Sequence, residues 1–197
     1  MNLSNLLFRS LAVALTAVTL SGCGAVVVGG VATTVAVAHD RRTTGTFIED
    51  QNILIKAIAM RSEDDELQQY ANVNISVYNM QVLLTGQAEN AAIVERFRDR
   101  VLTIPKVRGV FNEVSVGAES TWSEATADAY LTSKVKVALF DVDIEGFDPT
   151  RVDVTSSLGS VYLMGLLTVQ EADAVTEEVR FVSGVKRVVK LFEYIDG

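Results

Sequence analysis

The chain has 197 residues, which is enough for one domain or for two small ones. Its formal net charge of −8 argues against a nucleic-acid-binding protein, because such a protein needs a basic face that displaces counterions from phosphates. One cysteine and one histidine exclude a Cys/His metal cluster and an intramolecular disulfide.

The first 22 residues have the pattern of a lipoprotein signal peptide. Arg9 precedes the apolar stretch 11–20, which is long enough for a signal peptide but too short to cross a bilayer as a helix. The stretch ends in Leu20-Ser21-Gly22-Cys23, which resembles a bacterial lipobox, the motif whose cysteine is acylated. We therefore predict a signal peptide over 1–22 and lipid attachment at Cys23. The alternative is an ordinary signal peptide that contains a cysteine.

The residues that follow Cys23 predict a membrane anchor and a tether. Three acyl chains, at ~0.8 kcal/mol per buried methylene, would make attachment effectively permanent. Gly24 stands where an Asp commonly retains such lipoproteins in the inner membrane, so we expect an outer-membrane protein that faces the periplasm. Residues 24–38 are apolar and glycine-rich, and insertion into the membrane is the alternative to a tether. His39 has no visible partner and is assigned to the flexible tether, 23–45.

Beyond residue 46 the chain repeats itself with a spacing of about 79 residues. The segment "VNISVYNMQVLLTG" (73–86) aligns with "VDVTSSLGSVYLMG" (152–165), and 105–116 aligns with 183–195. Helical patterns lie at 53–61 and 89–102 in the first copy, and at 131–140 and 168–182 in the second. We predict two domains, 46–116 and 126–197, joined by a linker over 117–125. A domain of this size is marginal alone, so we expect the copies to touch.

The spacing within one copy predicts how it folds. Apolar residues alternate over 73–77 and 82–84, which is typical of half-buried strands. Asn79-Met80, and Gly159 in the second copy, lie where a hairpin must reverse. The following helix makes the last strand parallel to its partner through a right-handed crossover. The expected fold class is α+β: each domain has the order αββαβ, with two helices packed on one face of a three-stranded mixed sheet.

The "V-x-L-x-G" close of the hairpin and the later "V-x-x-V" strand resemble the BON domain. A lipobox, a "DRRTTG" linker and two such copies together resemble the dual BON-domain outer-membrane lipoproteins. The resemblance implies a lipoprotein that supports envelope integrity and binds anionic phospholipid, such as phosphatidylglycerol or cardiolipin, without catalytic activity. The chain departs from this pattern at two positions. Lys190 replaces a usual Asn, present as Asn112, and Tyr130 replaces a common Trp, while the single Trp122 lies earlier.

The helix at 129–140 carries two apolar stripes instead of one. Leu131, Val135 and Leu139 fall on one face, which suits a domain core. The other stripe combines aromatic and aliphatic side chains with lysines, which suits the boundary of an anionic membrane. We predict a phospholipid-binding site formed by Tyr130, Lys134, Lys136, Val137 and Phe140.

Two alternatives stay open for this second stripe. It could be covered by the first domain or by the linker around Trp122. It could also dock an envelope protein, such as an outer-membrane assembly or cell-wall factor, because a groove on a protein would favour the same side chains. The helix "ILIKAIAM" (53–60) of the first copy is apolar on most of its circumference, which favours burial between the domains.

No motif indicates an enzyme, a cofactor or a metal site. The sequence lacks G-x-S-x-G, a phosphate-binding glycine loop and a second His or Cys that could complete a nucleophile–base pair. The acidic run "RSEDDE" (61–66) lacks the alternation of a calcium loop and is interpreted as a solvated loop. Asp141, Asp143 and Glu145 alternate, but nothing completes a ligand set. We therefore expect no catalytic residue, no cofactor and no metal.

Overall fold

The structure is a computed structural model, and it describes residues 40–117 and 122–196. The predictions for the signal peptide 1–22, Cys23, residues 24–38 and His39 lie outside the described residues. The described residues belong to one compact unit, which contains both sequence repeats.

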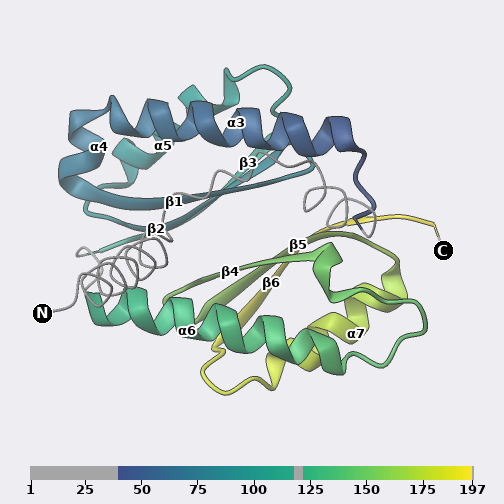
Figure 1. Cartoon of the computed structure of the whole chain (residues 1–197). Coiled ribbons are helices and arrows are strands. Elements are labelled where there is room, and N and C mark those ends of the chain that lie inside the picture. Colours follow the sequence, from purple (N-terminus) through teal and green to yellow (C-terminus); the bar gives the residue numbers. More distant parts are fainter. Residues whose placement is uncertain (1–39, 118–121, 197) are drawn as a thin grey trace, which may run out of the picture. The chain divides into compact units, whose positions relative to one another are not determined.

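The first repeat folds into a three-stranded sheet with helices on one side (Figure 1). Its elements are α3 (Thr44–Ser62), α4 (Asp65–Tyr70), β1 (Ala71–Tyr78), β2 (Gln81–Ala88), α5 (Ala91–Leu102) and β3 (Gly109–Val116). Strand β2 is central; it pairs with β1 in antiparallel and with β3 in parallel orientation.

The second repeat has the same topology, with β5 in the centre, β4 antiparallel and β6 parallel to it. Its elements are α6 (Trp122–Ala138), the 3₁₀ helices η1 (Leu139–Asp141) and η2 (Pro149–Arg151), β4 (Val152–Ser157), β5 (Ser160–Leu167), α7 (Val169–Arg180) and β6 (Arg187–Tyr194). The predicted α+β fold, with two helices on one face of a mixed sheet, is confirmed. The short helix α4 is an addition that the sequence did not predict.

Each domain has its own apolar core between the helices and the inner face of its sheet. Ile53 of α3, Leu84 of β2 and Phe97 of α5 are buried together in the first domain. Leu131 of α6 and Leu163 of β5 hold the positions of Ile53 and Leu84 in the second domain. Apolar residues spaced four apart on the helices and alternating along the strands form these cores, as predicted.

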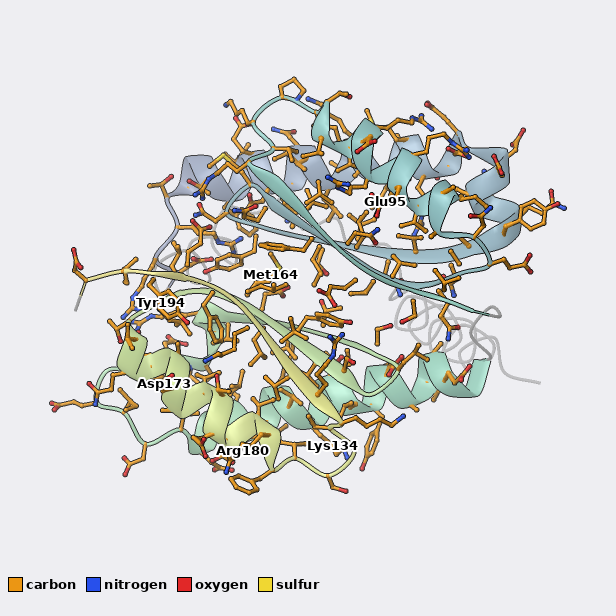
Figure 2. All side chains as sticks on the ribbon, turned by 180° about the vertical axis from the view of Figure 1, so that it is seen from behind. Glu95, Lys134, Met164, Asp173, Arg180 and Tyr194 are labelled. Atoms are coloured by element: carbon orange, nitrogen blue, oxygen red, sulfur yellow. The ribbon has the colours of Figure 1, made fainter. Side chains whose placement is uncertain are left out.

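A third apolar cluster joins the two domains through the outer faces of their sheets. Tyr78 and Leu83 of the first domain pack with Tyr162 and Met164 of the second, and all four side chains are buried. Figure 2 shows Met164 between the two sheets. The central strands are therefore buried on both faces, because alternate residues point to opposite sides of a sheet. The prediction that the two copies touch is confirmed.

The predicted burial of helix 53–60 between the domains is wrong. On α3, Ile53 and Ala57 are buried in the first domain's own core, but Ile55 is 64% exposed and Ile58 is also exposed. The physical reason is that the domains meet through their sheets, which leaves the outer stripe of this helix in solvent.

Both hairpins close with two residues in the left-handed region of backbone space. Asn79 and Met80 have φ values of 49° and 62°, and Leu158 and Gly159 have φ values of 53° and 80°. Positive φ at both central residues is what a two-residue type I′ turn requires, so the predicted turn positions are confirmed.

An aspartate on the first helix of each domain holds the hairpin turn. The carboxylate of Asp50 accepts hydrogen bonds from the backbone N–H groups of Asn79 and Met80, at 2.8 and 2.7 Å. In the second domain, Asp128 accepts from the N–H groups of Leu158 and Gly159, at 2.9 and 3.2 Å. Neither aspartate was predicted from the sequence, although the two occupy equivalent positions in the repeat.

Three helix starts differ from the sequence-based prediction. Helix α3 begins at Thr44, where the Thr43 side chain accepts a hydrogen bond from Thr46 N at 3.1 Å. The run 61–66 is no solvated loop, because Asp64 caps α4 by accepting from Leu67 N at 3.0 Å. Carboxylates are favoured at a helix N-terminus, where the first N–H groups lack partners. Helix α6 begins at Trp122, within the predicted linker 117–125.

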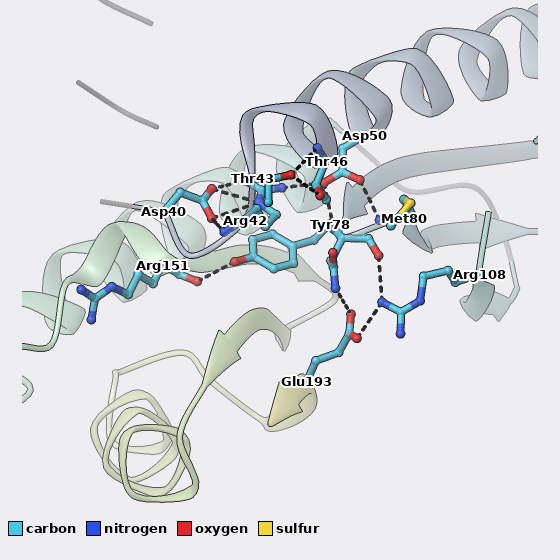
Figure 3. A network of polar contacts seen from close by, with 11 residues as sticks. Asp40, Arg42, Thr43, Thr46, Asp50, Tyr78, Met80, Arg108, Arg151 and Glu193 are labelled. Atoms are coloured by element: carbon cyan, nitrogen blue, oxygen red, sulfur yellow. Dashed lines mark hydrogen bonds and ion pairs between the residues drawn. The ribbon is translucent and has the colours of Figure 1, made fainter. Parts of the chain in front are cut away.

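Residues 40–45, the junction segment, are part of the folded unit. Arg42 donates to Asp50 at 2.7 Å and stacks on Tyr78, with its guanidinium carbon 3.9 Å from the ring centroid (Figure 3). Arg41 reaches the second domain, where it donates to the Glu171 carboxylate at 2.5 and 2.9 Å. For these residues the prediction of a flexible tether over 23–45 is corrected, because charge-assisted hydrogen bonds hold them to both domains. The rest of that range lies outside the described residues.

Replacing Glu171 with glutamine is expected to destabilise the protein at neutral pH and to flatten its acid dependence. Burial raises the pKa of Glu171, but hydrogen bonds from Arg41 and Thr168 outweigh it and hold the pKa below its usual value. A pKa depressed in the folded state contributes stability above the unfolded pKa, and this stability is lost as the pH falls through the folded pKa. Urea unfolding at several pH values should show a loss of about 1.5–3 kcal/mol at pH 7 that shrinks below pH ~4. Equal losses at all pH values would contradict this.

Candidate functional site

Helix α6 separates the two apolar stripes as its sequence predicts. Leu131 and Val135 on one side are buried in the core of the second domain. On the other side Tyr130, Val137 and Phe140 are 66%, 68% and 72% exposed. The alternative that the first domain covers this stripe therefore does not hold in the structure. Large apolar side chains gathered on one exposed face are typical of an interaction surface.

The two predicted lysines border this surface in different ways. Lys134 donates to the carbonyl oxygen of Ser183, and its ammonium lies 5.1 Å from the centroid of the Tyr130 ring. Lys136 is exposed and lies near Asp153 on β4. Burial raises the pKa of Asp153, and the charges of Lys136 and Arg42 oppose this effect without cancelling it.

The five predicted residues do not line one common hollow. Tyr130, Lys134 and Val137 border an open hollow together with Val182 from the end of α7. Phe140 and Lys136 border a different cavity of about 450 Å³, whose wall also includes Arg42, Tyr78 and Asp153. The division follows from helix geometry, since residues 130, 134 and 137 lie almost in line while 136 and 140 are rotated away.

Other exposed side chains extend the surface and were missed by the sequence analysis. Phe181 directly follows α7 and is 74% exposed, with the Arg180 guanidinium 4.5 Å from its ring centroid. Lys186 borders a hollow that also includes Tyr130 and Lys134. Figure 2 shows Arg180 and Lys134 on the same outer edge of the second domain. Phe181 could have been found, because it follows the core position Val179 by two residues and so falls off the core stripe of α7.

We define the α6 surface as Tyr130, Lys134, Lys136, Val137, Phe140, Phe181 and Lys186. It combines exposed apolar side chains with ammonium groups at their edges. Such a surface can insert rings at a polar boundary while the ammonium groups contact negative charges.

Within residues 40–117 and 122–196, no group of three or more His, Cys, Asp or Glu side chains could hold a metal ion. No helix in the described part of the chain is both long enough and apolar enough to cross a membrane.

The two α+β domains have the same topology, and the second strand of each carries the V-x-L-x-G motif. The chain is therefore a tandem repeat of one kind of domain. Residues 50–118 and 127–196 each match the BON domain, so the chain belongs to the BON domain family.

Two curated proteins are similar to this chain over most of its length. It is 35% identical over 178 residues to the outer membrane lipoprotein DolP of Haemophilus influenzae, which covers 90% of this chain and 91% of that protein. It is 29% identical over 157 residues to a 21 kDa hemolysin of Actinobacillus pleuropneumoniae, with 79% of each chain covered. Among solved structures, CdsD of the type III secretion system of Chlamydia trachomatis matches with 13% identity and a TM-score of 0.30, covering 75% of this chain and 64% of that one.

Proposed function

We propose that the protein is a non-catalytic outer-membrane lipoprotein that supports envelope integrity and binds anionic phospholipid through its second BON domain. Cys23 would carry the acyl anchor, and residues 24–39 would tether the folded unit on the periplasmic side. The lipid would contact the α6 surface, and the ligands would be phosphatidylglycerol or cardiolipin.

One observation carries this proposal: on α6 and the 3₁₀ helix η1 that follows it, three large apolar side chains are exposed, with the exposed Lys136 and the half-buried Lys134 beside them. Covering one such apolar side chain fully contributes about 1.5–3 kcal/mol. Each lysine near an anionic surface adds ~1 kcal/mol, so two lysines predict a preference for anionic lipid of roughly 30-fold. The net charge of −8 opposes binding, but physiological salt screens it beyond about 8 Å.

The relatives support the outer-membrane part of this proposal. DolP of Haemophilus influenzae is an outer membrane lipoprotein by name, and the similarity extends over 90% of this chain. An acyl anchor and a lipid-binding domain in one chain would also act together, since attachment raises the effective concentration of the surface at the membrane.

Co-sedimentation with vesicles tests the proposal. The soluble chain should begin at residue 40, because Arg41 and Arg42 belong to the folded unit and a later start would remove them. Vesicles of phosphatidylglycerol or cardiolipin should bind it, binding should weaken with salt, and phosphatidylcholine vesicles should not bind it. Absence of binding to every vesicle would overturn the proposal and would favour an envelope protein as the partner of this surface.

The double substitution Tyr130→Glu and Phe140→Glu is expected to lower vesicle affinity by at least ~30-fold. It removes two rings from the surface and adds two charges that an anionic membrane repels. A matched control is Ile48→Glu with Ile55→Glu, which adds the same charge at exposed apolar positions on α3. The control should bind nearly as well as the unaltered chain. An equal loss in both variants would mean that total charge, and not the α6 surface, governs binding.

A further inference from the structure

A cavity of about 370 Å³ lies between the two domains. Its wall is formed by β1 and β2 of the first domain and by α6 and β4 of the second. It shares no residue with the α6 surface as defined above. A volume of this size is within the range of small-molecule sites.

The wall of this cavity is polar but almost without charge. Among its described lining residues, Asp128 is the only ionisable one, and none is aromatic. The Asp128 carboxylate already accepts the two N–H groups of the Leu158–Gly159 turn. An anionic ligand would therefore meet no cation and one carboxylate, which excludes a phosphate or carboxylate group.

Two buried polar atoms in this wall have no hydrogen-bond partner. Gln87 Oε1 on β2 and Ser156 Oγ on β4 are both buried and unpartnered within the described part of the chain. A buried polar atom left without a partner loses its hydrogen bonds to water without replacement, so such atoms are rare and require an explanation. Both residues line the same cavity although they belong to different domains.

The neighbouring wall residues supply further neutral hydrogen-bonding groups. Asn74 and Thr132 contribute an amide and a hydroxyl from opposite domains. The Thr155 hydroxyl hydrogen-bonds to the Ser76 hydroxyl at 2.9 Å, which ties β4 to β1 beside the cavity. The cavity thus presents amides and hydroxyls from two domains that are held together.

We propose that this cavity binds a neutral polyhydroxylated ligand about the size of one sugar unit, bridging the two domains. A ligand hydroxyl both donates and accepts, so it can donate to Gln87 Oε1 and pair with Ser156 Oγ in either role. Neutrality follows because the described wall has no cation and its one carboxylate, that of Asp128, already accepts two backbone N–H groups. Without an aromatic ring for stacking, recognition rests on hydrogen bonds, and the expected dissociation constant is in the millimolar range.

The test is a titration of the full-length, detergent-solubilised protein, followed by the side-chain amide NMR signals of Gln87 and Asn74. Glucose, N-acetylglucosamine and glycerol are added separately, with sodium phosphate, potassium chloride and sodium chloride as comparisons. At least one polyol should shift these signals saturably, and the three salts should not. Shifts with potassium chloride alone would identify a cation site instead, and absence of shifts with all three polyols would leave only water in the cavity; either result overturns the proposal.

Ser156→Ala separates binding from stability. It should weaken polyol binding about tenfold without lowering the thermal midpoint, because it removes an atom that has no partner in the folded protein. The matched control is Ser115→Ala, at an exposed position on β3 outside the cavity. Should Ser156→Ala fail to fold, Gln87→Leu provides the same comparison from the first domain. Unchanged binding in the variant that folds would contradict the proposed site.

Discussion

Gly86→Ala is expected to destabilise the first domain severely, by roughly 4 kcal/mol or more. Gly86 has a φ of +117°, a conformation that residues with a Cβ atom rarely adopt. A Cβ at this position would lie 2.0 Å from the carbonyl oxygen of Asn72 on the paired strand β1. Relief would require the two strands to separate where Val73 pairs with Gly86 in the centre of the sheet. Urea unfolding, followed by circular dichroism, measures the loss.

Two other glycines provide graded controls for this prediction. A Cβ at Gly165, the equivalent residue of the second repeat, would lie 2.8 Å from the Arg151 carbonyl oxygen, so Gly165→Ala should cost less, about 1–3 kcal/mol. A Cβ at Gly117 would meet nothing within 4 Å, so Gly117→Ala should be nearly neutral. An equal loss at Gly86 and Gly117 would refute the explanation by strand contact.

The glycine explains what the V-x-L-x-G motif does physically. The alternating Val82 and Leu84 fill the core side of β2, and Gly86 lets β1 pass at close range. The sequence analysis used this motif as a marker of the repeat, and strand alternation with the turn at Asn79-Met80 was enough to predict the sheet. These features are local, so a short stretch of sequence contains them.

Features that depend on contacts between distant residues were not predictable in the same way. Leu83 and Tyr162 are equivalent strand residues of the two repeats, and nothing local indicates that they meet across the domain interface. Arg41 contacts Glu171, a residue 130 positions away in the chain, and a periodicity argument cannot find such a pair. Helix 53–60 is an example. Its apolar outer stripe suggested that it is buried between the domains, whereas the two sheets form the domain interface.

The part of the candidate site that lies on α6 was predictable, because helix geometry decides which residues share a face. Because residues 130, 137 and 140 cannot share the core face with 131 and 135, the sequence predicts that they lie outside the core of the second domain. Their exposure to solvent comes from the structure, because the sequence left open that another part of the chain covers them. Phe181 and Lys186 come from the following helix and its loop, and only the fold places Lys186 beside Tyr130. The equivalent helix α3 exposes Ile55 and Ile58, so the repeat conserves the fold but gives each domain a different surface.

Asp50→Ala is expected to lower the free energy of unfolding by about 3–5 kcal/mol, the range for one partner lost from a buried ion pair. Asp50 is 1% exposed, and its carboxylate accepts from Asn79 N, Met80 N and the Arg42 guanidinium. Alanine would leave the N–H groups of Asn79 and Met80 without an acceptor. Both residues have a left-handed backbone conformation, which is costly unless other contacts stabilise it. It would also remove one of the two carboxylates that hold Arg42 against Tyr78.

Asp128→Ala tests whether the turn amides or the ion pair with Arg42 accounts for most of the stabilisation by Asp50. Asp128 makes the same two turn contacts in the second domain but is only half-buried, so its loss should cost about 1–3 kcal/mol. Hydrogen exchange should show faster exchange of the amides of Asn79 and Met80 in the first variant, and of Leu158 and Gly159 in the second. If both aspartates proved equally costly, the turn amides alone would account for the stabilisation. A larger loss at Asp50 would show that Arg42 ties the junction segment to the first hairpin. Arg42 also stacks on Tyr78, whose hydroxyl donates to the Arg151 carbonyl oxygen at 3.3 Å, so this contact extends to the second domain.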